Sequence, residues 1–543
     1  MESLKDQSQR GPKSSLEKLT KSETIELRNR HIGQSVTLFF KKNPLKIVRG
    51  QRQYMYDEND NEYLDCINNV AHVGHCHPLV VDAAHQQMKL IATNSRFLHD
   101  NIVLYAKRLS DYLPERLSVC FFVNSGSEAN DLAIRLARCY TKNKDIISID
   151  GAYHGHLTTL TDISSMKFLK INGTKKKKWV HLISLPCQYR GRYNLDQFKE
   201  NEIGSLYAEE VDELIKNVKQ SGRQIAAFIH ESMISCGGQI VLPQNYLQKV
   251  YRQVRSKYRV RRLNGLRDRS GLKMKFANRK WIAFNFFDCL IYNRIVRDAG
   301  GVCIADEVQV GFGRTGKMWA FEHQNVVPDI VTMGKPMGNG HPLACVVTTP
   351  EIAECFAKIG TEYFNTYGGN PVSLAVGNAV LDVIESENLI QNATEIGQIL
   401  LNELNRLKEK YQIIGDVRGL GYFIGVDLVL NRRSKKPATT IAEYVVARFK
   451  ENRILMSTEG KFGNVLKFKP PMLFDRQNVQ QFIKVFDEIL QEIHCCTQLS
   501  RSSSVSSAYS SDSCGPDLIS SDSLSDEETV FYDCGGRSFQ QQL

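Results

Sequence analysis

The chain has 543 residues, of which 42% are hydrophobic and 24% are charged. These values are ordinary for a globular protein and exclude a collagen-like, mucin-like or wholly disordered chain. The length allows about three or four domains, although one large α/β core with appendages fits it equally well. Lysine and arginine outnumber the acidic residues by 70 to 59, which gives a formal net charge of +11. Because such an excess is typical of proteins that bind nucleic acid or anionic membranes, its position along the chain matters.

The sequence gives few signs of a targeting segment or a metal. It contains no uncharged apolar run near the ~20 residues of a membrane-spanning helix. Acidic residues are scattered through residues 1–33, which fits neither a secretory signal nor a transit peptide. The 14 cysteines form no C-x-x-C pair, and adjacent ligands in His75-Cys76-His77 would be geometrically awkward. We therefore expect no metal site and a reduced, soluble, intracellular protein of the cytoplasm or the mitochondrial matrix.

In chain order, residues 1–25 are polar and lack helical or strand periodicity, so we expect a flexible N-terminal arm. Residues 26–100 are predicted to be the first part of a smaller α+β domain. Residues 101–394 alternate short apolar runs with helical patterns, such as the one at 128–140. Runs that are apolar on both faces are typical of buried parallel strands, so this region is predicted to be a large α/β domain with a mainly parallel sheet. The predicted strands cover 119–123, 146–149, 225–229, 302–304, 330–333 and 344–347.

The large domain is interrupted by residues 255–296. This segment contains 12 basic and 2 acidic residues, a net charge of +10, so the rest of the chain carries a net charge of +1. It separates a helical pattern at 244–254 from the predicted strand at 302–304. We interpret it as an unspliced or alternative segment with no evolved function, and the alternative is an acquired regulatory or binding loop.

The C-terminal part of the chain has two sections. Residues 395–495 are predicted to complete the smaller domain, with a helix over 396–407 and a strand over 421–429. Residues 496–543 are rich in serine and in acidic residues, a composition that predicts a disordered tail.

A candidate anion site follows the strand at 119–123, where residues 124–130 read NSGSEAN. Gly126 lets the backbone approach a ligand closely and Ser127 supplies a hydroxyl. The start of the following helix presents free N–H groups. This combination favours a phosphate dianion, and an ordinary strand–helix turn capped by serine is the alternative.

Two charged residues follow other predicted strands. Asp306, in ADEVQVGFGR at 305–314, stands at the carboxyl end of a strand, where open α/β sheets bind ligands. Such a carboxylate needs a cationic partner, for example a protonated pyridine nitrogen, unless it caps the next element. Lys335, in TMGKPMGNG at 332–340, opens a Gly/Pro-rich loop. A lysine held in a pocket is shifted toward its nucleophilic form and can make a Schiff base with an aldehyde, whereas a lone loop lysine is usually solvated.

Together these motifs resemble the class III family of pyridoxal-phosphate-dependent aminotransferases. The resemblance runs from about residue 30 to 495 outside the 255–296 segment, and its most specific part is 304–340. It implies the α/β fold of pyridoxal-phosphate-dependent transferases, fold type I, with pyridoxal 5′-phosphate as the cofactor. It also implies a homodimer with active sites at the subunit interface and a small-molecule amine as the substrate.

The resemblance assigns a role to each matching residue. Lys335 looks like the lysine that is linked to the cofactor and later moves a proton, and Asp306 resembles the residue that keeps the pyridine nitrogen protonated. The other cofactor-binding residues follow in the same way: Val308 and Tyr153 on the two ring faces, Gln309 near the ring hydroxyl, Glu231 as a nearby acid, Gly126 and Ser127 at the cofactor phosphate, and Thr366 as a phosphate contact from the partner subunit.

One departure from the family bears on the reaction. Amino-acid transaminases of this family usually carry an arginine before the C-terminal Pro-Pro, where it pairs with a substrate carboxylate through two hydrogen bonds. Here Lys467 occupies that place, in NVLKFKPP at 464–471, and lysine does not reproduce that contact. The segment looks like the ethanolamine-phosphate and phosphohydroxylysine phospho-lyases, the alanine-glyoxylate aminotransferase 2-like branch. These release phosphate, ammonia and an aldehyde, and Lys467 or Lys469 would balance the leaving phosphate unless both are solvated strand lysines.

Two alternatives stay open. A transaminase that moves an amino group from an ω-amino acid or alanine to glyoxylate or pyruvate would use the same cofactor residues. A catalytically impaired variant, or a basic binding protein on an enzyme fold, would draw on the lysines at 175–178, the adjacent Trp179 and the 255–296 segment. Since that segment holds nearly all of the excess charge, we expect no nucleic-acid partner and no membrane partner.

Overall fold

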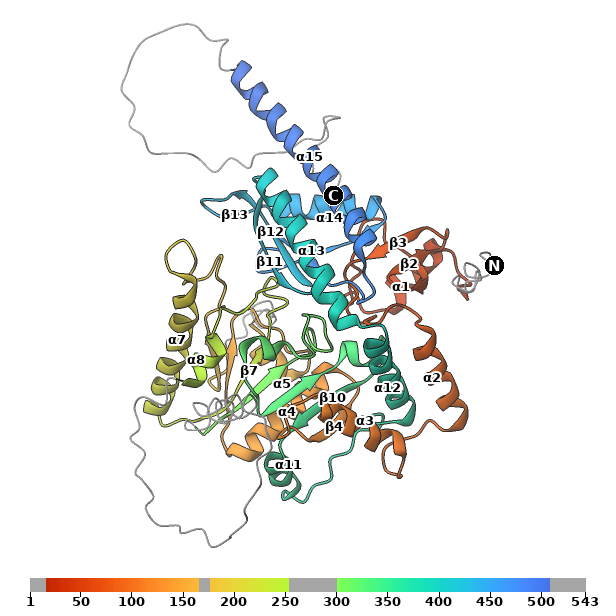
Figure 1. Ribbon diagram of the computed structural model, residues 1–543, viewed down its shortest axis with the longest axis vertical. Coiled ribbons are helices and arrows are strands. Elements are labelled where there is room, and N and C mark those ends of the chain that lie inside the picture. The colour runs from red at the N-terminus through yellow and green to blue at the C-terminus, as the bar shows by residue number, and fades with distance from the viewer. Residues whose placement is uncertain (1–15, 166–175, 253–299, 508–543) are drawn as a thin grey trace, which may run out of the picture.

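The computed structural model describes residues 16–165, 176–252 and 300–507 (Figure 1). The predicted insert, 255–296, lies outside the described residues, as do 508–543 of the predicted tail.

A seven-stranded sheet forms the centre of the large domain and positions the site. Its order is β4-β10-β9-β8-β7-β5-β6. Strand β10 is antiparallel to both of its neighbours, and the pairing from β9 to β6 is parallel. The predicted strands are confirmed, whereas β6 was not predicted, because a histidine interrupts its short apolar run. The strands are β4 Val119–Val123, β5 Asp145–Ile149, β6 Val180–Ile183, β7 Ile225–Glu231, β8 Val302–Asp306, β9 Ile330–Met333 and β10 Ala344–Thr348.

Apolar clusters lie on both faces of this sheet. In β8, Ile304 belongs to the cluster that α4 covers, whereas Cys303 and Ala305 belong to the larger cluster on the opposite face. This alternation is the period of two that a strand imposes on its side chains, and it explains why the strands are apolar on both faces. The helices of the large domain are α3 Asp100–Asp111, α4 Gly126–Thr141, α5 Thr158–Ile163, α7 Glu200–Gln220, α8 Tyr246–Arg252, α11 Pro350–Ala357 and α12 Pro371–Ser386, with 3-10 turns η2 Ala320–Gln324 and η3 Lys335–Gly338.

The smaller domain joins segments from both ends of the chain, above the large sheet in Figure 1. A four-stranded sheet of order β1-β2-β3-β14 pairs N-terminal strands with a C-terminal one, and a five-stranded sheet is built on β11-β12-β16-β15. Helix α2, which lies within the predicted 26–100 segment, packs instead against α12 of the large domain. The elements are α1 Lys21–His31, β1 Ile47–Gln51, β2 Tyr54–Asp57, β3 Glu62–Asp65, α2 Pro78–Leu90, α13 Leu389–Lys410, β11 Ile414–Leu420, β12 Phe423–Asn431, β13 Lys436–Pro437, α14 Thr439–Glu451, β14 Ile454–Leu455, β15 Ser457–Glu459, β16 Val465–Phe468 and α15 Arg476–Ser507.

Both predicted flexible ends contain helix that the sequence analysis did not predict. Helix α1 begins inside the 1–25 arm, where Thr20 and Glu23 form a capping box, and none of its residues is buried. Without an apolar stripe it gave no periodic signal. At the other end α15 runs to Ser507, well into the predicted 496–543 tail. Buried Phe482 and Phe486 anchor this helix, and propagation from an anchored turn adds one hydrogen bond per residue.

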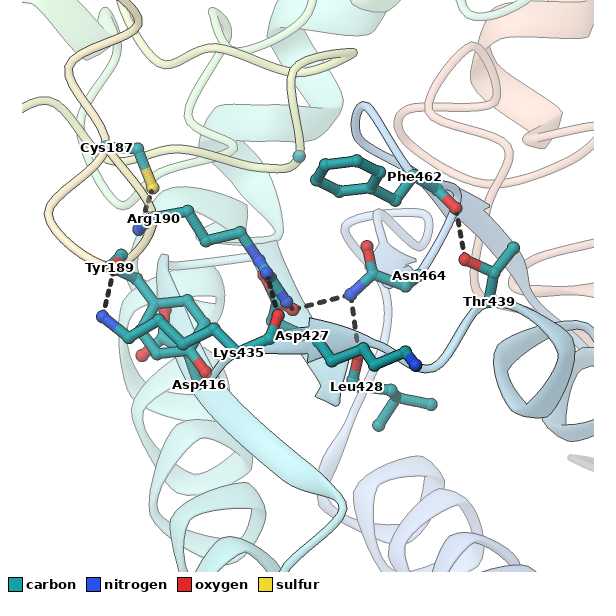
Figure 2. A network of polar contacts seen from close by, with 12 residues as sticks. Cys187, Tyr189, Arg190, Asp416, Asp427, Leu428, Lys435, Thr439, Phe462 and Asn464 are labelled. Atoms are coloured by element: carbon teal, nitrogen blue, oxygen red, sulfur yellow. Dashed lines mark hydrogen bonds and ion pairs between the residues drawn. The ribbon is translucent and has the colours of Figure 1, made fainter. Parts of the chain in front are cut away.

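A buried ion-pair network attaches the smaller domain to the large one (Figure 2). Asp427 of β12 is buried and accepts hydrogen bonds from Arg190 Nε at 3.0 Å and Arg190 Nη2 at 2.7 Å. Arg190 lies in the segment after β6, so the pair joins the two domains. The Asn464 amide donates to the same carboxylate at 2.8 Å. Nearby, Arg418 of β11 donates to the Gly238 carbonyl oxygen at 2.6 Å, beyond the end of β7.

Replacing Asp427 by alanine is expected to lower the free energy of unfolding by about 3 kcal/mol. The change leaves a largely buried guanidinium without its carboxylate, and the partial exposure of Arg190 places the loss at the low end of the range for buried pairs. Urea denaturation followed by circular dichroism measures it. Arg406→Ala, which removes a surface pair with Glu403, is the matched control and should change stability by less than about 0.5 kcal/mol. Equal losses in the two variants would contradict the interpretation.

Candidate functional site

The candidate site is a cavity of about 340 Å³ at the carboxyl ends of the parallel strands, where open α/β sheets bind ligands. Asp306 ends β8 and Lys335 directly follows β9, while Tyr153 comes after β5. The first turn of α4 follows β4 and completes the wall. The cavity brings together these predicted residues: Gly126, Ser127, Tyr153, Asp306, Val308, Gln309 and Lys335.

The Asp306 carboxylate is buried and held by donors from three elements. Its Oδ2 accepts hydrogen bonds from Asn130 Nδ2 at 2.7 Å and from His154 Nδ1 at 2.9 Å. Its Oδ1 accepts only the Val308 N–H, at 3.1 Å, so it keeps a lone pair for a cationic partner in the cavity. Thr332 of β9 fixes Asn130 in turn, donating to its Oδ1 at 2.6 Å. The network therefore stabilises the negative charge and aims it into the cavity.

Lys335 shares the cavity with this carboxylate. Burial lowers the pKa of Lys335 below its ordinary value, and the Asp306 charge opposes the shift. Its backbone has φ of 23°, in the left-handed region that a side chain rarely adopts, as is common at functional sites. The lysine is thus closer to its nucleophilic neutral form than a solvated lysine would be.

The first turn of α4 forms a cradle with unpaired N–H groups. Ser125 caps the helix by accepting the Glu128 N–H at 3.2 Å, which leaves the N–H groups of Gly126 and Ser127 for a ligand. A Cβ added to Gly126 would lie 2.7 Å from Val308 Cγ1, and one added to Gly155 would lie 2.6 Å from Ser127 Oγ. The cradle can therefore be built only with glycine at these two positions.

Two hydrogen-bond donors that do not line the cavity orient the Gln309 side chain. Its Oε1 accepts hydrogen bonds from Asn69 Nδ2 at 2.7 Å and from Lys469 Nζ at 3.2 Å. Because both of these partners are donors, the amide oxygen faces them and the Nε2–H₂ group is the end left for the cavity. Gln309 therefore presents a hydrogen-bond donor to the cavity.

Glu231 lies behind Tyr153 and outside the cavity lining. It ends β7, and its carboxylate accepts the N–H groups of Tyr153 and Ser235, each at 3.0 Å. Burial raises the pKa of Glu231 above its ordinary value. Its contacts hold the segment that carries Tyr153.

The remaining predicted residues do not line the cavity. Lys467 of β16 pairs with Glu459 at 2.6 Å. Lys469 is buried, with its Nζ 2.5 Å from Ser235 Oγ. Burial lowers the pKa of Lys469 well below its ordinary value, and the charge of Lys467 lowers it further. Thr366 is exposed, on the segment that precedes α12.

The sequence analysis missed the residues that support the carboxylate. Asn130 closed the NSGSEAN segment without receiving a role, although it lies one helical turn from Gly126 and so on the same face of α4. His154 follows Tyr153 directly, and strand-end histidines have no sequence pattern that marks a carboxylate partner. Among the described residues, no group of three or more His, Cys, Asp or Glu side chains could hold a metal ion. No helix in the described part of the chain is long and apolar enough to cross a membrane.

The fold and site define a pyridoxal-phosphate enzyme of the aminotransferase type, and comparisons with known proteins give the family. The model of the family "Aminotransferase class-III" matches residues 40–258 and 291–490, and the unmatched 259–290 lies inside the predicted insert. The chain belongs to this family. It is therefore a pyridoxal-phosphate-dependent enzyme that acts on a small-molecule amine.

Three similar proteins span most of the chain. An alanine–glyoxylate aminotransferase 2-like protein of Drosophila melanogaster is 50% identical over 88% of each chain. The ethanolamine-phosphate phospho-lyase homolog 1 of Caenorhabditis elegans is 38% identical over 87% of this chain and 94% of its own. A solved structure of a phospholyase from Arthrobacter, in complex with phosphoethanolamine, has a TM-score of 0.74 at 32% identity and covers 86% of this chain and 99% of its own.

The residues present fit pyridoxal phosphate. The carboxylate of Asp306 has a free lone pair for a pyridinium nitrogen, and Lys335 lies in the same cavity for the aldehyde. The glycine cradle at the start of α4 suits the phosphate, because it offers unpaired N–H groups where any Cβ would clash. The Gln309 amide offers a donor for the ring hydroxyl.

Lys335→Ala is expected to abolish the covalent attachment of the cofactor. Alanine has no amine to form the bond, although Asp306 and the α4 cradle are left intact. The purified variant should lose the absorbance of the lysine-linked cofactor near neutral pH, and borohydride treatment should attach no cofactor to the protein. A variant that still retains reducible, covalently bound cofactor would show that another residue forms the linkage.

Gly126→Ala is expected to weaken cofactor binding by roughly tenfold or more. The new Cβ would lie 2.7 Å from Val308, and overpacking of this kind costs about 1–3 kcal/mol. Titration of the apoenzyme with pyridoxal phosphate measures the dissociation constant. Gly33→Ala is the control, since the nearest atom to its Cβ is 3.9 Å away, and it should bind the cofactor as the wild type does.

Proposed function

We propose that this enzyme is a phospho-lyase that releases phosphate, ammonia and an aldehyde from phosphoethanolamine or phosphohydroxylysine. The observation that carries the proposal is the pair of lysines beside the cofactor lysine. Lys467 stands where transaminases of the family usually have arginine, and buried Lys469 lies two residues further on. The charges of Lys467 and Lys335 both lower the pKa of Lys469, and Lys469 donates to Gln309 of the cavity wall at 3.2 Å, so the pair of lysines lies next to the site. The Caenorhabditis and Arthrobacter relatives carry matching names.

In this proposal each residue of the site has one role. Bound pyridoxal phosphate supplies the electron sink that stabilises negative charge on the substrate carbon. Asp306 holds a proton at the ring nitrogen, and Gln309 donates to the ring hydroxyl. Gly126 and Ser127 bind the cofactor phosphate, Val308 and Tyr153 flank the ring, and Glu231 supports Tyr153. Lys335 Nζ removes the proton from the carbon that bears the amine.

The two lysines act on the substrate phosphate. A phosphate that leaves carries its electron pair away, and neighbouring cations lower the energy of that step. Burial favours the neutral form of Lys469, and a phosphate dianion that binds nearby stabilises its protonated form. Lys467 is paired with Glu459 at 2.6 Å, and the substrate phosphate competes with that carboxylate for its charge. Water then adds to the unsaturated amine that remains, and aldehyde and ammonia are released.

A transaminase is the second candidate, favoured by the Drosophila relative at 50% identity, whose name describes an aminotransferase-like protein. The cofactor residues serve both reactions equally. The difference lies in the second substrate, because a transaminase needs a keto acid such as glyoxylate or pyruvate to take up the amino group.

The proposal includes a homodimer in which Thr366 contacts the cofactor phosphate of the partner subunit. Thr366 is exposed and does not line the cavity of its own subunit. Exposed apolar side chains lie on α2, on α3 and in the two segments at 91–98 and 359–367, the second of which contains Thr366. Arg96 joins these segments, pairing with Glu362 at 3.0 Å and lying 3.8 Å over the Phe364 ring. Exposed apolar patches of this kind mark interfaces; this one includes Leu90, Phe97, Leu98, Val103, Leu104 and Tyr367.

We also place the enzyme inside the cell, in the mitochondrial matrix or the cytoplasm. The cysteines of the described residues are free thiols, as expected in a reducing compartment.

Incubating the full-length protein with phosphoethanolamine should release inorganic phosphate, ammonia and aldehyde in equal amounts without any keto acid. Phosphate release is measured colorimetrically, with phosphohydroxylysine as the second substrate. Amino transfer that depends on glyoxylate or pyruvate, with no phosphate release, would establish the transaminase instead.

Lys467→Ala is expected to lower kcat/KM for the phosphorylated amine about 10- to 100-fold. A hydrogen bond to a charged group contributes about 1.5–3 kcal/mol, and each 1.4 kcal/mol corresponds to a factor of ten. Lys461→Ala, which removes an exposed lysine of the preceding loop, is the matched control and should leave kcat/KM unchanged. Equal effects of the two substitutions would remove Lys467 from the phosphate site.

A further inference from the structure

The cavity contains an imidazole to which the chemistry above gives no role. His341 lies between η3, which contains Lys335, and strand β10, and it lines the same cavity as Lys335 and Asp306. It is half-buried. His154 hydrogen-bonds to Asp306, whereas the side-chain hydrogen bond of His341 goes to Ser373.

The hydrogen bonds around His341 fix which ring nitrogen carries the proton. Nε2 lies 2.9 Å from Ser373 Oγ. That hydroxyl has one hydrogen, and it donates this hydrogen to the Pro342 carbonyl oxygen at 3.1 Å. Asn370 Nδ2 donates to the same Oγ at 2.7 Å. With its hydrogen on that carbonyl oxygen, Ser373 Oγ accepts from His341, an arrangement that puts the hydrogen on Nε2 and the lone pair on Nδ1.

This lone pair is the part of the ring available to a ligand. Ser373 is buried and does not line the cavity, so the Nε2 edge of the ring is turned toward the protein. Nδ1 is not one of the buried, unpartnered polar atoms of the described chain. Burial lowers the pKa of His341 below its ordinary value, and no charged side chain contributes to the shift. The titratable side chains that share the cavity are Lys335, Asp306, Tyr153 and His154.

The substrate brings a proton that must be removed. A primary amine resembles the lysine side chain, whose pKa is about 10.4, so it enters the cavity as an ammonium ion. An ammonium nitrogen has no lone pair and cannot attack a carbonyl carbon or its nitrogen analogue. Asp306 is committed to the ring nitrogen, Lys335 to the cofactor and His154 to Asp306. Burial raises the pKa of Tyr153, so the phenol keeps its proton, and the His341 imidazole is left as the base of this cavity.

We propose that His341 is a catalytic residue that accepts a proton at Nδ1 from the ammonium group of the incoming substrate. One N–H bond of the ammonium breaks, and its electron pair stays on the amine nitrogen. A new N–H bond forms at Nδ1, which converts the imidazole to an imidazolium, and the proton later passes to water. The proposal rests on the amine substrate of the enzyme and not on phosphate as the leaving group.

The test is the rate at which the full-length holoenzyme reacts with phosphoethanolamine, followed in a stopped-flow instrument by the absorbance of the bound cofactor. In the wild type the bimolecular rate constant should be nearly independent of pH around neutrality and fall below the pKa of His341, because an imidazolium accepts no proton. In His341→Ala it should be about 100-fold lower near neutral pH. It should then rise tenfold per pH unit as the free-amine fraction of the substrate grows.

Added imidazole shows whether His341 accepts a proton or only supports the structure. It should restore much of the rate of His341→Ala, with a dependence on the unprotonated form of the buffer. His323→Ala is the matched control, since this half-buried histidine pairs with Thr315 outside the cavity, and it should show the wild-type rate and no rescue. His341→Gln, which keeps the polar volume, replaces the alanine variant if that fails to fold.

Three results would overturn the proposal. The first is a pH profile in His341→Ala that matches the wild type, and the second is a reduced rate that imidazole does not restore. The third is weaker cofactor binding with an unchanged rate constant per loaded subunit, which would assign His341 to the cofactor phosphate. If the wild type itself neither reacts with phosphoethanolamine nor releases phosphate, the phospho-lyase assignment fails separately. The same measurements with β-alanine then decide the role of His341.

Discussion

A carboxylate at the buried end of a strand is unfavourable by several kcal/mol unless donors and a cation surround it. Asp306 is placed in this way, and much of the site follows from its needs. Its donors come from α4, from the segment after β5 and from its own chain two residues on. Because these elements must converge on one carboxylate, they are also held at fixed distances from Lys335. A protonated ring nitrogen bound in the cavity would complete the charge balance at Oδ1.

The strands were predictable because their environment is simple. A strand buried on both faces is a short apolar run, and β4, β9 and their neighbours were found within a residue or two of their ends. Strand β6 was missed because His181 breaks its run, and that histidine is explained by a distant partner, Asp145 of β5, 2.8 Å away. Helix α1 was missed for the opposite reason, since nothing in it is buried. The local sequence shows neither the distant partner of His181 nor the exposure of α1.

The chemical groups of the site were more predictable than their supports. Asp306 ends β8, and Lys335 and Gly126 stand two and three residues after β9 and β4. Chain order therefore places all three at the carboxyl edge of the sheet. Asn69 and Ser373 act through contacts with residues far away in the sequence, Gln309 and His341, and no spacing rule connects them to the motifs. The position of Lys469 is another example. Its sequence context indicated a strand lysine, whereas its burial behind Gln309 depends on how the smaller domain is seated by Arg190 and Asp427.

The close contact between Gly126 and Val308 fixes the distance between two parts of the cofactor site. Because there is no room for a Cβ between them, the cradle at the start of α4 and the side chain of Val308 are held at one fixed distance. A ligand must therefore span both ends with a single rigid length. Pyridoxal without its phosphate could meet Asp306 and Lys335 but would leave the helix N–H groups unsatisfied, and a longer molecule would lift away from the carboxylate. The distance between the α4 cradle and Asp306 would therefore favour a ligand that carries a phosphate at one set distance from its ring nitrogen.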